Sequence, residues 1–238
     1  MYEELDFRPT PIGDLMLRRR RLIQLGGLDI YEAKLGGYFL MTSLFHEAEV
    51  QLSKFGLGVL DKKDLDVVIG GLGLGSTAVS ALKDKRVTSL VVVEYLERVI
   101  EWHQTGLVPL GKTLTGDSRC QLVHADFFAL SRDVSKSFDP EYPANKHDVI
   151  LLDIDHTPTN VLHQTNTRFY TEEGLGELSQ HLKPGGVFGL WADGFPEESF
   201  TNLLGRVFES VESHIIEFDN PLTGGSSEGA VYVARVSL

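Results

Sequence analysis

Between residues 66 and 191, short apolar runs alternate with stretches of mixed polarity. Runs such as DVVIG, SLVVVE and DVILLD are apolar on both faces, which is typical of parallel strands covered by helices on both sides. The stretches between them have the spacing of helices. The pattern predicts strands over 66–70, 89–94, 120–124, 148–153 and 187–191, and helices over 77–83, 97–104 and 172–182.

The two ends of the chain have a different pattern. Residues 14–42 alternate apolar and polar side chains between pairs of glycines, which predicts a small antiparallel sheet. Residues 43–55 then have helical spacing, with Ser43 as the expected N-cap. The last β-type runs, VESHIIEF and GAVYVARV, have no helix between them and should pair antiparallel at one edge. We therefore expect an α/β fold in two parts, a β-rich segment with a linking helix over 1–57 and a Rossmann-like core over 58–238.

Composition and charge limit the class of protein, its expected location and its expected partners. The 238 residues include 22 basic and 34 acidic side chains and the single cysteine Cys120, which excludes a disulfide framework. An acidic start without an apolar signal core, and no apolar run long enough for a membrane span, predict a cytoplasmic protein. The net charge of −12 argues against nucleic acid as a partner. The arginine run 18–21 is better explained as a solvated strand or dimer contact, and dispersed histidines predict no metal site.

The strongest motif is the sequence VVIGGLGLGSTA, in which a buried strand runs through a glycine-rich turn into a helix. Its glycines, Gly70, Gly71, Gly73 and Gly75, allow a tight turn and close approach of a ligand to the backbone. The next predicted strand ends at Glu94, where a carboxylate can accept hydrogen bonds from both ribose hydroxyls. Together these features predict a nucleoside site.

The glycines alone do not identify the nucleoside ligand, because Gly73 to Ala78 also fits the dinucleotide fingerprint G-x-G-x-x-A. Two other features favour an adenosyl-sulfonium ligand. Asp126 ends a third strand, where it can bond an adenine amino group, and a Lys183-Pro184-Gly185-Gly186 turn precedes the last parallel strand. An NAD-dependent oxidoreductase is the weaker alternative.

Several stretches resemble the spermidine synthase family of aminopropyltransferases, within the class I S-adenosylmethionine-dependent methyltransferase fold. The resemblance rests on the segment TPIG near the start, FHE at 45–47, VIGG in the glycine loop, VEY with RVI at 93–100, ADF at 125–127, and DVILLD at 148–153. It covers nearly the whole chain. It implies decarboxylated S-adenosylmethionine as donor, a polyamine-type amine as acceptor, no metal, and a homodimer that pairs through the N-terminal segment.

The predicted chemistry is displacement at a carbon attached to a sulfonium. An aliphatic amine has a pKa near ~10 and must lose a proton before it attacks. Asp153, at the end of its strand, is the expected base, and Asp155 and His156 are expected to hold the amine. The resemblance adds His46 to the donor site and Glu47 to the acceptor site. Tyr170 follows the catalytic turn and is expected to close over the substrate.

The sequence also departs from the family pattern. Gly73 stands where the family has an aspartate that contacts the aminopropyl amine, Phe45 replaces a tyrosine, and the D-S-S-D signature is here Asp153-Ile154-Asp155-His156. The loop 157–164 differs as well. Gly73 favours a second hypothesis, a methyltransferase that uses S-adenosylmethionine itself. A third is a nucleoside-binding homologue without catalysis, against which Asp153 argues.

Overall fold

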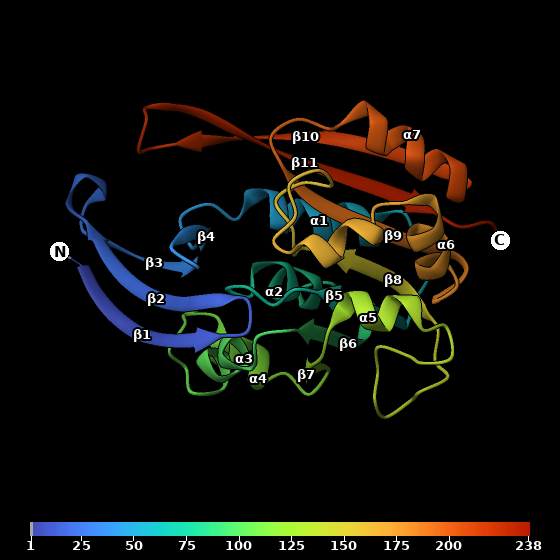
Figure 1. The fold of residues 1–238 in the computed structure, drawn as a ribbon, viewed down its shortest axis with the longest axis horizontal. Helices are drawn as coiled ribbons and strands as arrows, with labels where there is room; N and C mark the ends of the chain where they lie inside the picture. The colour runs from blue at the N-terminus through green and yellow to red at the C-terminus, as the bar shows by residue number, and fades with distance from the viewer. Residues whose placement is uncertain (1) are drawn as a thin grey trace.

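A computed structural model describes residues 2–238. It contains a four-stranded sheet of order β1-β2-β3-β4 and a seven-stranded sheet of order β10-β11-β9-β8-β5-β6-β7 (Figure 1). Strands β5 to β9 are parallel, and β11 runs antiparallel to both β9 and β10. The predicted α/β architecture, with its antiparallel edge pair and separate N-terminal sheet, is confirmed.

The N-terminal sheet is antiparallel throughout and includes a strand that precedes the predicted range 14–42. Its strands are β1 (Tyr2–Thr10), β2 (Gly13–Leu22), β3 (Leu28–Leu35) and β4 (Tyr38–Thr42), with a 3-10 turn η1 (Ile23–Leu25) after β2. Strand β1 was missed because it is a largely exposed edge strand without apolar alternation. The arginines of β2 form ion pairs within the sheet: Arg18 and Arg20 both contact Glu32 at 2.7 Å.

Strand β1 also fixes the N-terminal sheet to the core. The Asp6 carboxylate accepts hydrogen bonds from Arg98 Nε at 2.6 Å and from Trp102 Nε1 at 2.8 Å. Both donors belong to helix α3 (Glu97–Gln104). These charge-assisted bonds hold the far end of the sheet, β4, beside the carboxyl ends of the parallel strands.

The large sheet agrees closely with the predicted strands. Its members are β5 (Leu65–Gly70), β6 (Val87–Glu94), β7 (Cys120–His124), β8 (His147–Leu152), β9 (Leu182–Asp193), β10 (Ser210–Asn220) and β11 (Gly225–Arg235). Strand β9 begins five residues earlier than predicted because Leu182 already pairs with His147 of β8. The helix expected over 172–182 consequently stops at Ser179.

Helices cover both faces of this sheet. They are α1 (Glu47–Gly58), α2 (Ser76–Leu82), α3, α4 (Gly111–Thr115), α5 (Phe127–Arg132), α6 (Glu172–Ser179) and α7 (Glu198–Val207), with a 3-10 turn η2 (Gln164–Arg168). Val67 and Ile69 of β5 face the core under α1 to α3, whereas Val68 faces the core under α5 to α7. None of the described helices is long and apolar enough to cross a bilayer.

The start of α1 differs from the prediction. Ser43 does not cap it, because the helix begins at Glu47 and the Ser43 hydroxyl accepts a hydrogen bond from the Tyr31 amide instead. The short helices α4, α5 and α7 were not predicted. Helix α5 is capped by Asp126, whose carboxylate accepts from the Ala129 amide at 3.0 Å.

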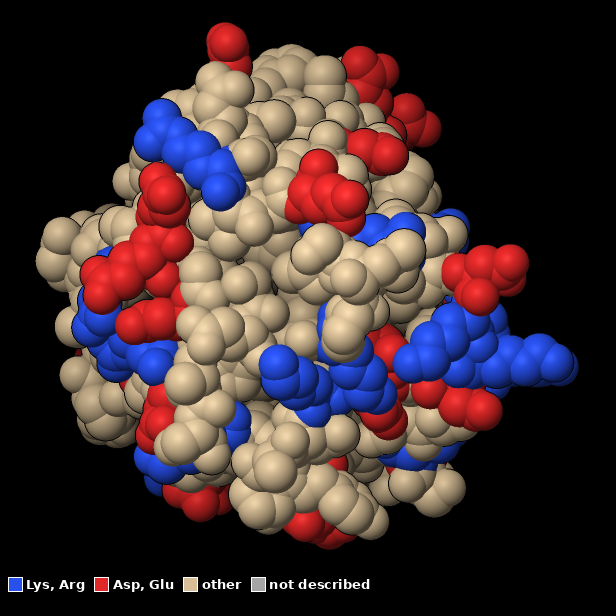
Figure 2. Space-filling model, turned by 90° about the vertical axis from the view of Figure 1, so that its right-hand side faces the viewer, with Lys and Arg blue, Asp and Glu red and all other residues tan. Residues whose placement is uncertain are grey.

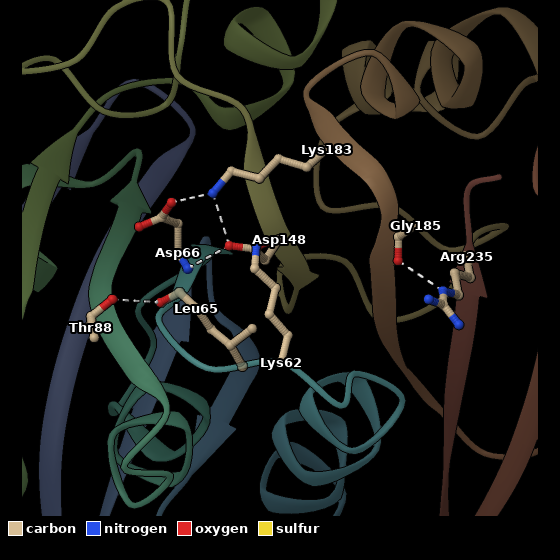
Figure 3. A network of polar contacts seen from close by, with 8 residues as sticks. All are labelled: Lys62, Leu65, Asp66, Thr88, Asp148, Lys183, Gly185 and Arg235. Carbon is tan, nitrogen blue, oxygen red and sulfur yellow. Dashed lines mark hydrogen bonds and ion pairs between the residues drawn. The ribbon is translucent and has the colours of Figure 1, made fainter. Parts of the chain in front are cut away.

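The amino ends of the parallel strands are tied together by charged side chains (Figure 3). The Asp148 carboxylate of β8 accepts from the Asp66 amide of β5 at 3.0 Å and from Lys183 Nζ of β9 at 2.9 Å, and it also pairs with Lys62. Burial opposes ionisation of Asp148, but these bonds lower its pKa overall. On this side of the molecule, lysine and arginine side chains stand among acidic ones (Figure 2).

Candidate active site

A cavity of about 790 Å³ opens at the carboxyl ends of the parallel strands. Its walls come from the glycine loop after β5, the ends of β6, β8 and β9, the end of β4 with the start of α1, and the hairpin of β10 and β11. The turn between β1 and β2, the start of α5 and the loop 156–166 contribute as well. Figure 1 shows that the N-terminal sheet and this hairpin project to the same side of the core. Ligands of open α/β sheets bind at this edge.

The glycine loop forms one wall of the cavity through Gly71, Gly73 and Gly75, which all have positive φ angles. A Cβ on Gly71 would lie 2.1 Å from the Asp153 carbonyl oxygen, so only glycine allows the loop to pass the end of β8. Gly70 does not line the cavity, since it lies against the Phe127 ring. The His103 ring contacts the Gly73 carbonyl at 3.0 Å and supports the loop.

Glu94 and Asp126, both predicted as ligand-binding residues, line the cavity beside this loop. The buried Glu94 carboxylate accepts hydrogen bonds from the Leu72 amide at 3.0 Å and from the Leu96 amide at 2.8 Å. Burial raises the pKa of Glu94, and the amide bonds oppose that rise. Each carboxylate oxygen retains acceptor capacity for a ribose hydroxyl. Glu94 therefore fixes the loop and still presents acceptors to a ligand.

Asp153 lies directly after β8 on the cavity wall. One carboxylate oxygen accepts from the Thr77 hydroxyl at 2.6 Å, and its amide donates to the Gly70 carbonyl at 2.8 Å. Burial raises the pKa of Asp153 to about 6, the Thr77 bond opposes the rise, and Asp193 adds to it. A carboxylate with this pKa is ionised at neutral pH and is more basic than an ordinary aspartate.

Two further carboxylates share this part of the cavity, Glu49 of α1 and Asp193 at the end of β9. We refer to Glu49, Asp153 and Asp193 as the carboxylate cluster. Burial, and then the charge of Asp153, raise the pKa of Glu49 to about 8. Glu49 was not predicted from the sequence, although a signal was present. Glu49 lies on the same helical stripe as the buried residues Ser53 and Gly56, whereas Glu47 does not.

Asp155 is directed away from the cavity and is only 2% exposed. Its carboxylate accepts from the Leu162 amide at 2.6 Å, from Asn166 Nδ2 at 2.9 Å and from the Tyr170 hydroxyl at 2.8 Å. Burial raises the pKa of Asp155 against these bonds. The structure thus brings the predicted residues Asp155 and Tyr170 together, but beneath the loop 156–166 and not in the cavity wall.

The remaining predicted residues lie at the cavity mouth or outside it. His156 lines the cavity, and its Nδ1 lies 3.1 Å from the Asp193 carboxylate, which raises the pKa of the imidazole. His46 is exposed at the N-cap of α1. Glu47 accepts a hydrogen bond from the His46 amide at 2.9 Å. Neither His46 nor Glu47 is part of the cavity wall in this structure.

Apolar side chains complete the cavity opposite the carboxylates. The rings of Phe45 and Phe218 lie 5.6 Å apart, so the phenylalanine in place of the family's tyrosine packs against the hairpin. Met41 Sδ would lie 3.3 Å from a Cβ on Gly73. The Trp191 indole also lines the cavity, and its Nε1 is buried without a hydrogen-bond partner among the described residues.

The fixed charge of the cavity has one sign. No lysine or arginine is among the described residues that line it, whereas the lining carboxylates are Glu49, Glu94, Asp126, Asp153, Asp193 and Glu228. Such a lining attracts cations and disfavours a phosphate or carboxylate ligand. Over residues 2–238, no group of histidine, cysteine and acidic side chains has the arrangement of a metal site.

Comparison with solved structures places the fold. A spermidine synthase in complex with the transition-state analogue AdoDATO superimposes with a TM-score of 0.74 at 18% identity, over 98% of this chain and 73% of that one. Spermidine synthase from Thermotoga maritima gives a TM-score of 0.72 at 18% identity, over 98% and 72%. A probable spermidine synthase from Corynebacterium glutamicum gives 0.64 at 15%, over 96% and 79%. No protein-family model matches the sequence.

The chain therefore has the fold of the spermidine synthases, a class I methyltransferase-like core preceded by a small β-sheet. The resemblance that the sequence indicated is confirmed at this level.

Proposed function

We propose that the protein is a transferase that moves the aminopropyl group of decarboxylated S-adenosylmethionine onto a polyamine-type amine. The observation that carries this proposal is the excess of carboxylates in the cavity behind the glycine loop, where no lysine or arginine is among the described lining residues. Both proposed substrates are cations, a sulfonium with an ammonium group and an amine that is protonated in solution. Intact S-adenosylmethionine would bring a carboxylate into a cavity without lysine or arginine, and NAD would bring a pyrophosphate.

The cavity contains the groups that this reaction needs. The glycine loop, Glu94 and Asp126 are suited to hold the nucleoside, and the acceptor nitrogen would lie near Asp153. The nitrogen lone pair attacks the carbon attached to sulfur, so the C–N bond forms as the C–S bond breaks and its electron pair passes to sulfur. Asp153 takes the proton that the amine must lose. The Thr77 hydroxyl holds one oxygen of Asp153 and so orients the other.

One observation favours the second candidate, a methyltransferase. Gly73 supplies no carboxylate for the donor's ammonium group, and the adjacent Met41 sulfur is apolar. A methyl-transferring enzyme would bind intact S-adenosylmethionine, so donor preference separates the two functions.

The test is a calorimetric titration of the protein with decarboxylated S-adenosylmethionine, S-adenosylmethionine, 5′-methylthioadenosine and NAD. We expect the decarboxylated donor to bind more tightly than the intact one, and the reverse order would overturn the proposal. In a coupled assay with an amine acceptor, Asp153→Asn should lower kcat by about 10²- to 10⁴-fold, the usual contribution of a general base. Its affinity for 5′-methylthioadenosine should stay within about twofold of the wild type, because nucleoside contacts are kept.

A further inference from the structure

We propose that Glu49 is a specificity-determining residue for the acceptor. Its carboxyl group binds the second ammonium group of the acceptor and releases a proton as the acceptor binds. This inference rests on the proposed function, since it concerns the amine that the reaction consumes. It assigns to helix α1 a role that the sequence motifs place on the loop after β8. The resemblance indicated Asp155 as the second acid, but that carboxylate lies beneath the loop.

The geometry supports this assignment. Glu49 reaches the cavity from the first turn of α1, Asp153 follows β8, and Asp193 ends β9, so the carboxylate cluster faces one space from three elements. A single ammonium group offers one positive charge to three carboxylates, whereas a diamine offers two on a flexible chain. The apolar rings of Phe45 and Trp191 border the same space and suit the methylene groups between the charges.

The charged groups that surround Glu49 are mainly acidic, and they come from its own helix and from the strand ends that it faces. On its own helix the nearest charge is Glu47, from the strand ends it faces Asp153 and Asp193, and Glu228 of β11 lines the same cavity. Two histidines of the loop after β8, His156 and His163, also line the cavity, and His156 is paired with Asp193. No lysine or arginine of the described chain lines this cavity to neutralise Glu49.

Consequently the empty cluster holds a proton. Burial and the charge of Asp153 raise the pKa of Glu49 to about 8, which favours its protonated form near pH 7.5. An ammonium group brought beside Glu49 supplies the missing positive charge and favours the ionised form. The proton then leaves as the amine binds.

The experiment is calorimetric titration with 1,4-diaminobutane at pH 7.5, in phosphate, HEPES and Tris buffers, with saturating 5′-methylthioadenosine present throughout. Buffers of different ionisation enthalpy report the number of protons exchanged. For the wild type we expect net proton release, at most one proton per diamine bound, from the protonated fraction of Glu49. Glu49→Gln should release almost none and bind the diamine about tenfold more weakly, with a smaller loss for butylamine.

Glu198→Gln is the matched control, because Glu198 also lies in the first turn of a helix, α7, but is exposed and does not line the cavity. It should behave like the wild type. Proton release that persists in Glu49→Gln, or equal heats in all three buffers for the wild type, would overturn the inference while leaving the transferase proposal intact. If the diamine does not bind the wild type at all, the acceptor class of the proposed function fails, and this inference fails with it. Glutamine has the shape of protonated glutamate, and a thermal melt confirms that the variant is folded.

Discussion

Replacement of Asp155 by alanine tests whether this aspartate anchors the loop or takes part in the chemistry. Its carboxylate accepts from the Leu162 amide, the Asn166 side chain and the Tyr170 hydroxyl, and all of these donors lose their acceptor in Asp155→Ala. An unsatisfied buried donor costs roughly 1–3 kcal/mol. The loop 156–166 is partly exposed and can relax, so we take the lower value for each donor and expect a loss of about 3 kcal/mol.

Thermal unfolding followed by circular dichroism measures this loss. For a chain of this length, about 3 kcal/mol lowers Tm by roughly 6–12 °C. Asp155→Asn keeps one acceptor oxygen and should lose less, and Asp219→Ala, at an exposed position on β10, should stay within about 0.5 kcal/mol of the wild type. Turnover separates the two roles: Asp155→Asn should retain most of its kcat, whereas Asp153→Asn should not. A Tm for Asp155→Ala within 2 °C of the wild type, together with lost turnover, would refute the anchor and restore Asp155 to catalysis.

Two further predictions concern other positions. Gly73→Asp places a carboxylate where the family pattern has one. The φ of 50° at this position is one that aspartate and asparagine tolerate. We expect calorimetry to show about tenfold tighter binding of decarboxylated S-adenosylmethionine. Gly73→Asn has the same shape without the charge and should show no gain, and equal affinities would contradict the electrostatic reasoning. Burial lowers the pKa of His147 to about 4. Below pH 6.5 the unfolded chain therefore binds a proton at this histidine that the folded chain does not. The free energy of unfolding should fall by about 3 kcal/mol as the pH drops from about 6.5 to about 4. Urea unfolding across this range should show a shallower pH dependence in His147→Gln, and an unchanged slope would contradict the assignment to His147.

The sequence predicted best the strands and helices of the α/β core. The strand over 120–124 and the helix over 97–104 match β7 and α3 to the residue, because their apolar patterns and flanking turn residues are both local. Strand β1 could not be predicted in this way. It is held by its pairing with β2 and by the contacts of Asp6 with α3, which are distant in sequence.

The same difference between local patterns and contacts distant in sequence explains which residues of the candidate site were predicted. Glycines, Glu94 and Asp126 follow strand ends directly, and the edge of the sheet brings them to the cavity. A sequence motif could not predict the direction of the Asp155 side chain, because that direction depends on hydrogen-bond donors of the loop that follows. Glu49 was visible in the helical stripe, but its neighbours Asp153 and Asp193 come from elements more than 100 residues away along the chain.

The position of β11 has a consequence for how the chain is made. This strand lies between β10 and β9, so it fills an inner place in the seven-stranded sheet although it follows the other described strands along the chain. Until residue 235 has left the ribosome, β9 presents an open edge of unpaired amide and carbonyl groups. Such an edge is a template for pairing with other nascent chains. The same strand carries Glu228 and Gly229 of the cavity wall, so the ligand site and the closed sheet are completed in one late step of folding.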